Sequence, residues 1–568
     1  MTGFAMGRWS CFVLLLLLLQ GWSVADEAVL PPKVAVASAH PLATAAGIKI
    51  LESGGNAFDA AVAVAAALAV VEPYGSGLGG GGFWLLHSAE DNVDVMLDGR
   101  ERAPLAADRN LYLDAKSEVV AELSMNGPLA AGIPGVPAAL ALLSEKYGRL
   151  PLSVSLAPAI TLAQKGFVVD KVFQQMARFR LAALQASTDA RMLFLRSGQV
   201  PKDGTRLVQN DLAWTLEQMA ERGAAGFYQG EVAQRLLKSV TQSGGIWQQK
   251  DLDQYSVVER EPIRTEYHGM RLVSAAPPSS GGVALATILN ILEEFDIDMR
   301  DPVVRKHLIV EAMRRAYRDR AEFLGDPDFV PVPVSRLIHP LYAAGLRASI
   351  RENKATPSEI LPGVAPATSG GNTTHYSILD REGNRVAATL SVNYPFGSGF
   401  VAEGTGVLLN DEMDDFSAKP GVPNLYGLVG GEANSIAPGK RMLSSMSPTF
   451  LEYKDRVAIL GTPGGSRIIT MVLLSSLAFQ QGATAAEMVA LPRFHHQFLP
   501  DQIQYEKGAF SREEAFGLQW MGHELQEMER SYGNMQVIVW DKKKQKVEAA
   551  ADPRGIGAAK VKLISLQR

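Results

Sequence analysis

Thr373 stands where a glycine-rich loop meets a predicted strand, and its hydroxyl becomes an effective nucleophile if the chain is cut in front of it. A threonine hydroxyl needs a base to take its proton, and a free α-amino group with a pKa near ~8 is such a base on the same residue. Gly370 and Gly371 lack a Cβ, so the loop can present the Asn372 carbonyl to the Thr373 hydroxyl. An N-to-O acyl shift followed by hydrolysis would then split the chain. The residues indicate self-cleavage between Asn372 and Thr373.

The strand that Thr373 would begin is predicted from the alternation that follows it. His375, Ser377 and Leu379 alternate with Tyr376 and Ile378. Turn-forming residues occupy 380–384, and 385–392 has the pattern of a returning strand. Local chemistry leaves one alternative open, because two glycines before a threonine pair are also an ordinary entry into an edge strand.

Several sequence blocks resemble the γ-glutamyltranspeptidase family, in the same order along the chain. The block at the predicted cut is 372–377, Asn-Thr-Thr-His-Tyr-Ser. The others are 98–104 (DGRERAP), 409–417 (LNDEMDDFS), 441–449 (RMLSSMSPT) and 461–467 (GTPGGSR). The resemblance covers nearly all of the chain after residue 33. It implies an α+β fold, the four-layer αββα sandwich of N-terminal nucleophile hydrolases.

The resemblance also assigns roles to residues in these blocks. It implies that the backbone N–H groups of Gly464 and Gly465 form the oxyanion hole, where the absence of Cβ atoms permits close approach. It implies that Arg100, with its planar fork, binds the substrate α-carboxylate. The remaining implied substrate-binding residues are Ser444 and Ser445 at the carboxylate, Glu412, Asp415 and Asn393 around the α-ammonium, and Ser391 near the nucleophile.

Two positions depart from the family pattern, and one loop supports it. Glu412 stands where other members carry glutamine, and Ser391 where they often carry threonine, but each keeps an acceptor or a hydroxyl. The segment 420–426, ending at Tyr426, resembles the lid over the glutamyl pocket of bacterial members. Without the family, Arg100 could equally be a solvated charge and Asp415 part of an exposed turn.

The elements that must position these residues can be predicted from periodicity. Helices are expected over 41–52, 57–71, 136–147, 153–165, 283–294 and 308–323, and strands over 94–98, 456–460 and 534–540. Strands are expected to dominate after Thr373. The helix at 57–71 is apolar nearly all round and belongs inside a layered protein. Prolines, glycines and small residues make 353–372 the most linker-like region, yet matched blocks on both sides favour one intertwined domain of two chains, 26–372 and 373–568.

Composition and the first residues bound the class of protein. The chain has 568 residues, is 47% hydrophobic and carries a formal charge of -5. This small negative charge does not indicate a nucleic-acid-binding surface. Arg8, an apolar run at 11–19 and small residues up to Ala25 predict a signal peptide over 1–25 and a periplasmic location. A retained membrane anchor is the alternative, but the run is short of the ~20 residues that a spanning helix needs. Cys11, the only cysteine, lies in this segment, so the mature protein would have no disulfide.

Two further motifs carry less weight. The segment 75–80 fits G-x-G-x-x-G, but it follows an alanine-rich helix rather than a strand, so no dinucleotide cofactor is expected. His495 and His496 are adjacent, and neighbouring residues on a strand face opposite ways, so no metal is expected.

The resemblance therefore implies a γ-glutamyltransferase and glutathione hydrolase that passes the γ-glutamyl group to water or to amino-acid or dipeptide acceptors. A glutaryl or cephalosporin-type acylase of the same superfamily is the nearest alternative. Arg100, Asp415 and the lid argue against it, because a glutaryl group has no α-ammonium to bind. A periplasmic γ-glutamyl-peptide binding protein is the alternative from another class, but it has no use for an N-terminal threonine.

Overall fold

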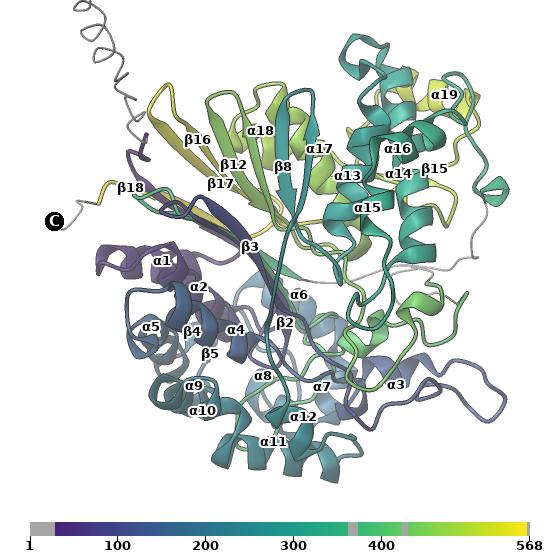
Figure 1. The fold of residues 1–568 in the computed structure, drawn as a ribbon. Coiled ribbons are helices and arrows are strands. Elements are labelled where there is room, and N and C mark those ends of the chain that lie inside the picture. The colour runs from purple at the N-terminus through teal and green to yellow at the C-terminus, as the bar shows by residue number, and fades with distance from the viewer. Residues whose placement is uncertain (1–28, 362–372, 423–429, 565–568) are drawn as a thin grey trace, which may run out of the picture.

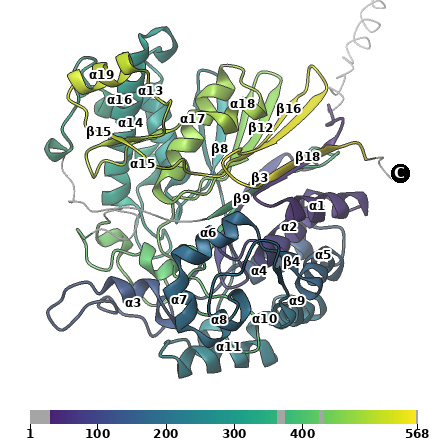
Figure 2. The ribbon, with the colours of Figure 1, turned by 180° about the vertical axis from the view of Figure 1, so that it is seen from behind.

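Two stacked β-sheets form the centre of the molecule, and helices cover both outer faces (Figures 1 and 2). The computed structural model describes residues 29–361, 373–422 and 430–564. The α+β class and the four-layer αββα arrangement are both confirmed by this architecture. In the part of the chain that the structure describes, no helix combines the length and apolar character needed to cross a membrane.

The first sheet has the strand order β18-β1-β9-β10-β2-β3-β6. Its strands are β1 (Val34–Ser38), β2 (Gly81–Ser88), β3 (Val93–Gly99), β6 (Val258–Arg260), β9 (Thr374–Leu379), β10 (Arg385–Ser391) and β18 (Ala558–Lys562). The strands β9 and β10 form the predicted antiparallel hairpin and lie between β1 and β2. Strands from both sides of Thr373 therefore share one sheet, which agrees with the expected intertwined domain.

The second sheet has the order β17-β16-β12-β11-β8-β7. Its strands are β7 (Ile263–Tyr267), β8 (Met270–Ser274), β11 (Thr449–Tyr453), β12 (Arg456–Gly461), β16 (Gln536–Asp541) and β17 (Lys546–Ala551). Two small sheets complete the β structure: β4 (Phe167–Val168) with β5 (Arg206–Leu207), and β13 (Phe494–His495) with β14 (Ile503–Tyr505) and β15 (Leu525–Glu527).

Helices from the first half of the described chain cover the outer face of the first sheet. They are α1 (Pro41–Glu52), α2 (Ala57–Val71), α3 (Ala121–Met125), α4 (Val136–Leu142), α5 (Leu152–Lys165), α6 (Lys171–Phe179), α7 (Leu181–Ala186), α8 (Thr188–Phe194), α9 (Asn210–Arg222), α10 (Ala225–Tyr228), α11 (Gly230–Gln242) and α12 (Gln249–Asp253). Every residue of α2 is buried, as its apolar sequence predicts, and Asn56 with Asp59 forms a capping box at its start.

Helices from the second half lie on the side of the second sheet. They are α13 (Gly281–Leu292), α14 (Pro302–Phe323), α15 (Val334–Leu337), α16 (Pro340–Arg347), α17 (Ile468–Gln480), α18 (Ala485–Ala490) and α19 (Arg512–Trp520). Three of these helices follow Thr373, so strands dominate there less completely than the sequence predicts. The helix predicted over 136–147 continues past α4 as a π-helical turn at Leu143–Tyr147.

Strand alternation divides the apolar core into two parts. Val36, Trp84 and Leu86 pack among the helices on the first sheet's outer face, whereas Phe83 and Leu85 belong to the cluster that includes both sheets' inner faces. This period of two is what a sheet covered on both faces requires. The predicted linker departs from expectation, because Thr356 and Ser358 are buried and hydrogen bonded to Glu311 and Asp501.

Candidate active site

One edge of the first sheet gathers the predicted nucleophile and its neighbours. Thr373 immediately precedes β9, and the register that pairs Leu390 with Thr374 brings Ser391, the last residue of β10, opposite Thr373. The strands β2 and β3 begin and end at the same edge, so Arg100 follows β3 there. Antiparallel pairing alone thus explains why residues so distant in sequence meet.

The matching edge of the second sheet supplies the other side of the site. Ser444 and Ser445 precede β11, whereas Gly464 and Gly465 follow β12, and the two strands are antiparallel. A small cavity of about 20 Å³ lies between the two edges. Its lining includes Thr373, Ser391, Asn393, Glu412, Asp415, Ser444, Ser445 and Gly465. Arg100 and Gly464 are not on its wall.

A second cavity, of about 340 Å³, shares no lining residue with the first. Its polar lining includes the carboxyl groups of Asp189 and Glu403 and the hydroxyl of Ser187. Thr373 is not among its lining residues, so we take the smaller cavity as the candidate active site.

The Thr373 side chain is 5% exposed and faces Ser391. The two hydroxyl oxygens lie 3.5 Å apart. The Ser391 hydroxyl also accepts from the backbone N–H of Asn393 at 2.7 Å and hydrogen bonds to Glu412. This chain of contacts links the nucleophile to the charged part of the pocket.

A buried cluster of one guanidinium and three carboxyl groups forms that charged part. Arg100 donates to Glu412 at 2.6 Å and to Asp415 at 2.5 Å, and Glu101 lies 3.6 Å away. Burial lowers the pKa of Arg100, but Glu412 and Asp415 outweigh it, so the net pKa is raised. Burial, reinforced by Glu412, raises the pKa of Glu101 well above its usual range. Burial also raises the pKa of Glu412 to about 7, although Arg100 opposes this shift. A cation that enters beside these carboxyl groups would favour their charged forms, so the cluster can accept a further positive charge.

The loop at Gly464 and Gly465 can hold an oxyanion. Both residues have positive φ, 143° and 58°, a conformation that favours glycine. Among the described residues, neither backbone N–H donates to an acceptor. Tyr317 of α14 donates to the Ser466 carbonyl and holds the next residue of the loop.

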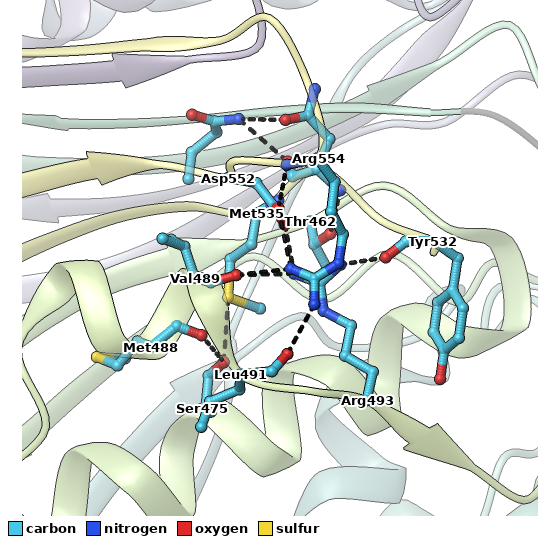
Figure 3. A network of polar contacts seen from close by, with 12 residues as sticks. Thr462, Ser475, Met488, Val489, Leu491, Arg493, Tyr532, Met535, Asp552 and Arg554 are labelled. Atoms are coloured by element: carbon cyan, nitrogen blue, oxygen red, sulfur yellow. Dashed lines mark hydrogen bonds and ion pairs between the residues drawn. The ribbon is translucent and has the colours of Figure 1, made fainter. Parts of the chain in front are cut away.

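A polar network fixes the base of this loop (Figure 3). The Thr462 hydroxyl accepts from the Asn534 N–H at 3.2 Å. Asp552 pairs with Arg493 and accepts from the Met535 N–H, which ties the following strand β16 to the same place. Arg554 donates to the carbonyls of Val489 and Leu491, so the network also reaches α18.

Sequence reasoning missed several groups around the site. Glu72, which follows the last residue of α2, accepts from the Thr374 hydroxyl at 2.6 Å. Thr374 is the residue next to the predicted nucleophile. Burial raises the pKa of Glu72 to about 8. Arg320 and Tyr317 reach the site from α14. Charged residues in a helical pattern usually indicate an exposed face, so the sequence contained no signal for them.

Of the remaining predicted residues, Asn393 lines the small cavity, and the others fall outside the described ranges. Asn393 has a positive φ of 72° and donates through its side chain to the Asp411 carbonyl at 3.0 Å. Tyr426, the signal peptide 1–25 and Asn372 fall outside the described residues.

Among the described residues, one cluster has side chains of the metal-ligand type, namely His307, Glu311 and His523. His307 Nδ1 and His523 Nε2 are already hydrogen bonded at 2.7 Å, and Glu311 accepts from Arg315 and from the Thr356 N–H. Two arginines beside the carboxylate oppose a further cation, so this cluster fits a hydrogen-bond network better than a metal site. His495 and His496 likewise have separate partners, Thr470 and Asp501.

Comparison with known proteins agrees with this geometry. The model of the family described as gamma-glutamyltranspeptidase matches residues 43–562. A glutathione hydrolase proenzyme of Pseudomonas sp. (strain A14) is 47% identical over 482 residues, covering 84% of each chain. One of Escherichia coli (strain K12) is 43% identical, covering 92% of this chain and 90% of the relative.

Solved structures show the same similarity. A cephalosporin acylase from Bacillus halodurans superposes with a TM-score of 0.82 at 28% identity, covering 94% of this chain and 96% of that one. A chain of Helicobacter pylori gamma-glutamyltranspeptidase gives a TM-score of 0.56 at 41% identity and covers 57% of this chain and 94% of its own length.

Proposed function

Because this chain belongs to the γ-glutamyltranspeptidase family, we propose that it cleaves itself before Thr373 and then hydrolyses or transfers γ-glutamyl groups through a Thr373 ester. Glutathione is the proposed donor, since the relatives are named glutathione hydrolase proenzymes. The observation that carries the proposal is the position of Thr373 at the head of a central strand, facing Ser391 in a pocket whose wall is charged.

In the proposed reaction, the amine released by self-cleavage takes the proton of the Thr373 hydroxyl. The oxygen attacks the γ-carbonyl carbon, and the Gly464 and Gly465 N–H groups receive the negative charge that develops on the carbonyl oxygen. Collapse of the tetrahedral intermediate breaks the γ-amide bond, and the leaving amine takes up the proton. Water or an acceptor amine then attacks the ester, which restores the Thr373 hydroxyl.

The wall of the pocket can hold both charges of a γ-glutamyl donor. Glu412, Asp415 and Asn393 would surround the α-ammonium, at the cluster that can accept a positive charge. Ser444, Ser445 and Arg100 would bind the α-carboxylate. Because Arg100 is hydrogen bonded to Glu412 and Asp415, its fork would be shared between these carboxylates and the substrate.

Two chains, 26–372 and 373–568, would remain joined after cleavage as a heterodimer. The strands β9 and β10 of the second chain pair with β1 and β2 of the first, so separation would break the middle of a sheet. Export to the periplasm through residues 1–25, a lid at Tyr426 and amino-acid or dipeptide acceptors belong to the same proposal.

An acylase for glutaryl or cephalosporin-type amides is the second candidate, since a cephalosporin acylase superposes on most of the chain. The carboxylates at Arg100 weigh against it, because a glutaryl group lacks the ammonium that would balance them. A binding protein fits less well still, because it would have no use for an oxyanion hole.

The test compares donors. Purified wild-type protein should release glutamate from glutathione and from other γ-glutamyl amides at far higher kcat/KM than it releases glutarate from glutaryl amides, and Thr373→Ala should release neither. Equal rates on the two donor classes would favour the acylase.

A further inference from the structure

Arg320 of α14 is a buried guanidinium beside the pocket, and the reaction proposed above does not use it. Arg320 is only 5% exposed to solvent. Among the described residues it forms no direct ion pair, in contrast to Arg100, and Asp415 attracts it from a longer distance. Burial lowers the pKa of Arg320 to about 10, so the side chain still carries its charge at neutral pH. A buried cation without a direct ion pair is costly, so an anion that enters the pocket beside it would be stabilised.

The donors of Arg320 reach the two loops that form the carboxylate end of the pocket. Nη2 donates to the Ser445 hydroxyl at 3.2 Å, and Nε donates to the Ser280 hydroxyl at 3.0 Å. Ser280 in turn donates to the Ser444 carbonyl at 2.7 Å and its N–H donates to the same oxygen at 2.8 Å. Arg320 is therefore connected to both Ser444 and Ser445.

The direction of these hydrogen bonds matters. A guanidinium can only donate, so the Ser445 oxygen accepts from Arg320 and its own proton remains available to an anion. Ser445 lines the cavity that Thr373 also lines. The arrangement aims a polarised hydroxyl, backed by a positive charge, into the pocket.

The pocket combines carboxyl groups with a guanidinium that acts through a hydroxyl. Glu412 and Asp415 lie on its wall, and the Arg320 guanidinium lies behind Ser445. An α-amino acid has the matching pair of charges on one carbon atom.

We propose that Arg320 is a specificity-determining residue that makes the pocket selective for donors with a free α-carboxylate, acting through the Ser445 hydroxyl. The inference rests on the proposed function and deepens it. Arg320 does not touch the scissile amide, so its loss should weaken binding rather than slow the chemical step.

The experiment compares wild type, R320Q, R320K and R305Q on γ-glutamyl-p-nitroanilide and on its α-carboxamide analogue. KM and kcat are measured by p-nitroaniline release, and self-cleavage into two chains serves as the folding control. Arg305 lies on the same helix and pairs with Asp298 at 2.9 Å, so R305Q removes one charge well away from the pocket.

For R320Q, we expect KM for the carboxylate donor to rise about 10-fold or more, with kcat nearly unchanged, since a charge-assisted hydrogen bond is lost. The preference in kcat/KM for the carboxylate donor over the carboxamide should fall by the same factor, and R305Q should behave as wild type. An equal loss on both donors, or no change on either, would overturn the inference and indicate that Arg320 only supports the loops.

Because R320Q could fail to fold, R320K gives a second comparison. Lysine keeps the charge but offers one nitrogen to two hydroxyl partners, so KM for the carboxylate donor should rise by about threefold and kcat should be retained. An unchanged KM, or an equal loss on both donors, would contradict this too. If the wild type released no p-nitroaniline at all, the proposed function would fall together with the inference, whereas an active wild type with an unselective R320Q effect would overturn the inference alone.

Discussion

The hydroxyl oxygens of Thr373 and Ser391 lie 3.5 Å apart, one position beyond the last residue pair of the β9–β10 hairpin, Thr374 and Leu390. Ser391 also contacts Glu412 and the Asn393 N–H, so it orients the nucleophile from a fixed position.

Replacing Ser391 with alanine should therefore slow both self-cleavage and turnover. We expect each rate to fall about 10-fold, which corresponds to the loss of one positioning hydrogen bond. Ser391→Thr should restore both rates, because it keeps the hydroxyl. The rates can be followed by the appearance of two bands on a denaturing gel and by glutamate release. Normal rates in Ser391→Ala would show that the contact plays no part.

Arg100→Ala should spare self-cleavage and weaken donor binding. Truncating one partner of a buried charge pair costs on the order of 2 to 5 kcal/mol, partly because Glu412 and Asp415 lose their cation. The expected result is a two-chain protein with a greatly raised KM for glutathione. Arg109→Ala is the matched control, since Arg109 pairs with Glu432 at the surface. An unchanged KM and kcat in Arg100→Ala would remove it from the site.

Gly464→Ala should lower kcat without preventing folding. Its φ of 143° is unfavourable for alanine, so the loop backbone would be strained, and the flexible end of Met471, 2.6 Å from an added Cβ, would have to move aside. Loss of an oxyanion donor costs on the order of 100-fold in kcat. Gly482→Ala is the control, because Gly482 has φ 99° and open space around it. Equal effects of the two substitutions would point to backbone strain rather than to the oxyanion.

Glu72→Gln should flatten the dependence of stability on pH between about pH 5 and pH 8. Burial raises the folded-state pKa of Glu72 to about 8, above its ordinary value of 4.5, so in this window the folded protein binds more protons than the unfolded chain. The contribution of Glu72 to the free energy of unfolding is fully present below pH 4.5. It declines as pH rises toward 8, by up to about 1.4 kcal/mol per pH unit. Glutamine mimics the neutral carboxyl, and comparing Tm of the two proteins isolates the effect. Parallel Tm curves for wild type and variant would contradict a neutral Glu72.

Transfer should gain on hydrolysis as pH rises. Only a neutral amine attacks the ester, and glycylglycine, with an amine pKa near ~8, should compete at lower pH than free amino acids. Glutamate and γ-glutamyl-glycylglycine are measured from one donor between mildly acidic and alkaline pH. A product ratio independent of pH and of acceptor concentration would refute a shared acyl-enzyme.

Much of the fold could be predicted from the sequence because its strongest patterns are local. The helix at 57–71 has the bounds that its apolar run predicts, and the hairpin after Thr373 follows from strict alternation and a turn. The four-layer αββα order, in contrast, came from the family resemblance. Sheet order depends on contacts between segments hundreds of residues apart, such as β1 with β9, which periodicity does not encode.

The candidate site shows the same limit. Thr373 could be recognised because its chemistry follows from its own amine and from the glycines before it. Arg320, Tyr317 and Glu72 could not, because each acts through a neighbour that only the fold supplies: Ser445, Ser466 and Thr374. A buried arginine on a helix looks in sequence like a solvated one.

The Thr373 hydroxyl is expected to perform both self-cleavage and catalysis. Purified wild type and Thr373→Ala are run on a denaturing gel, and the N-terminus of every band is sequenced. We expect two bands for the wild type, the smaller starting at Thr373, and a single uncut band for Thr373→Ala. Two normal fragments from Thr373→Ala, or a smaller wild-type chain that starts at another residue, would contradict it.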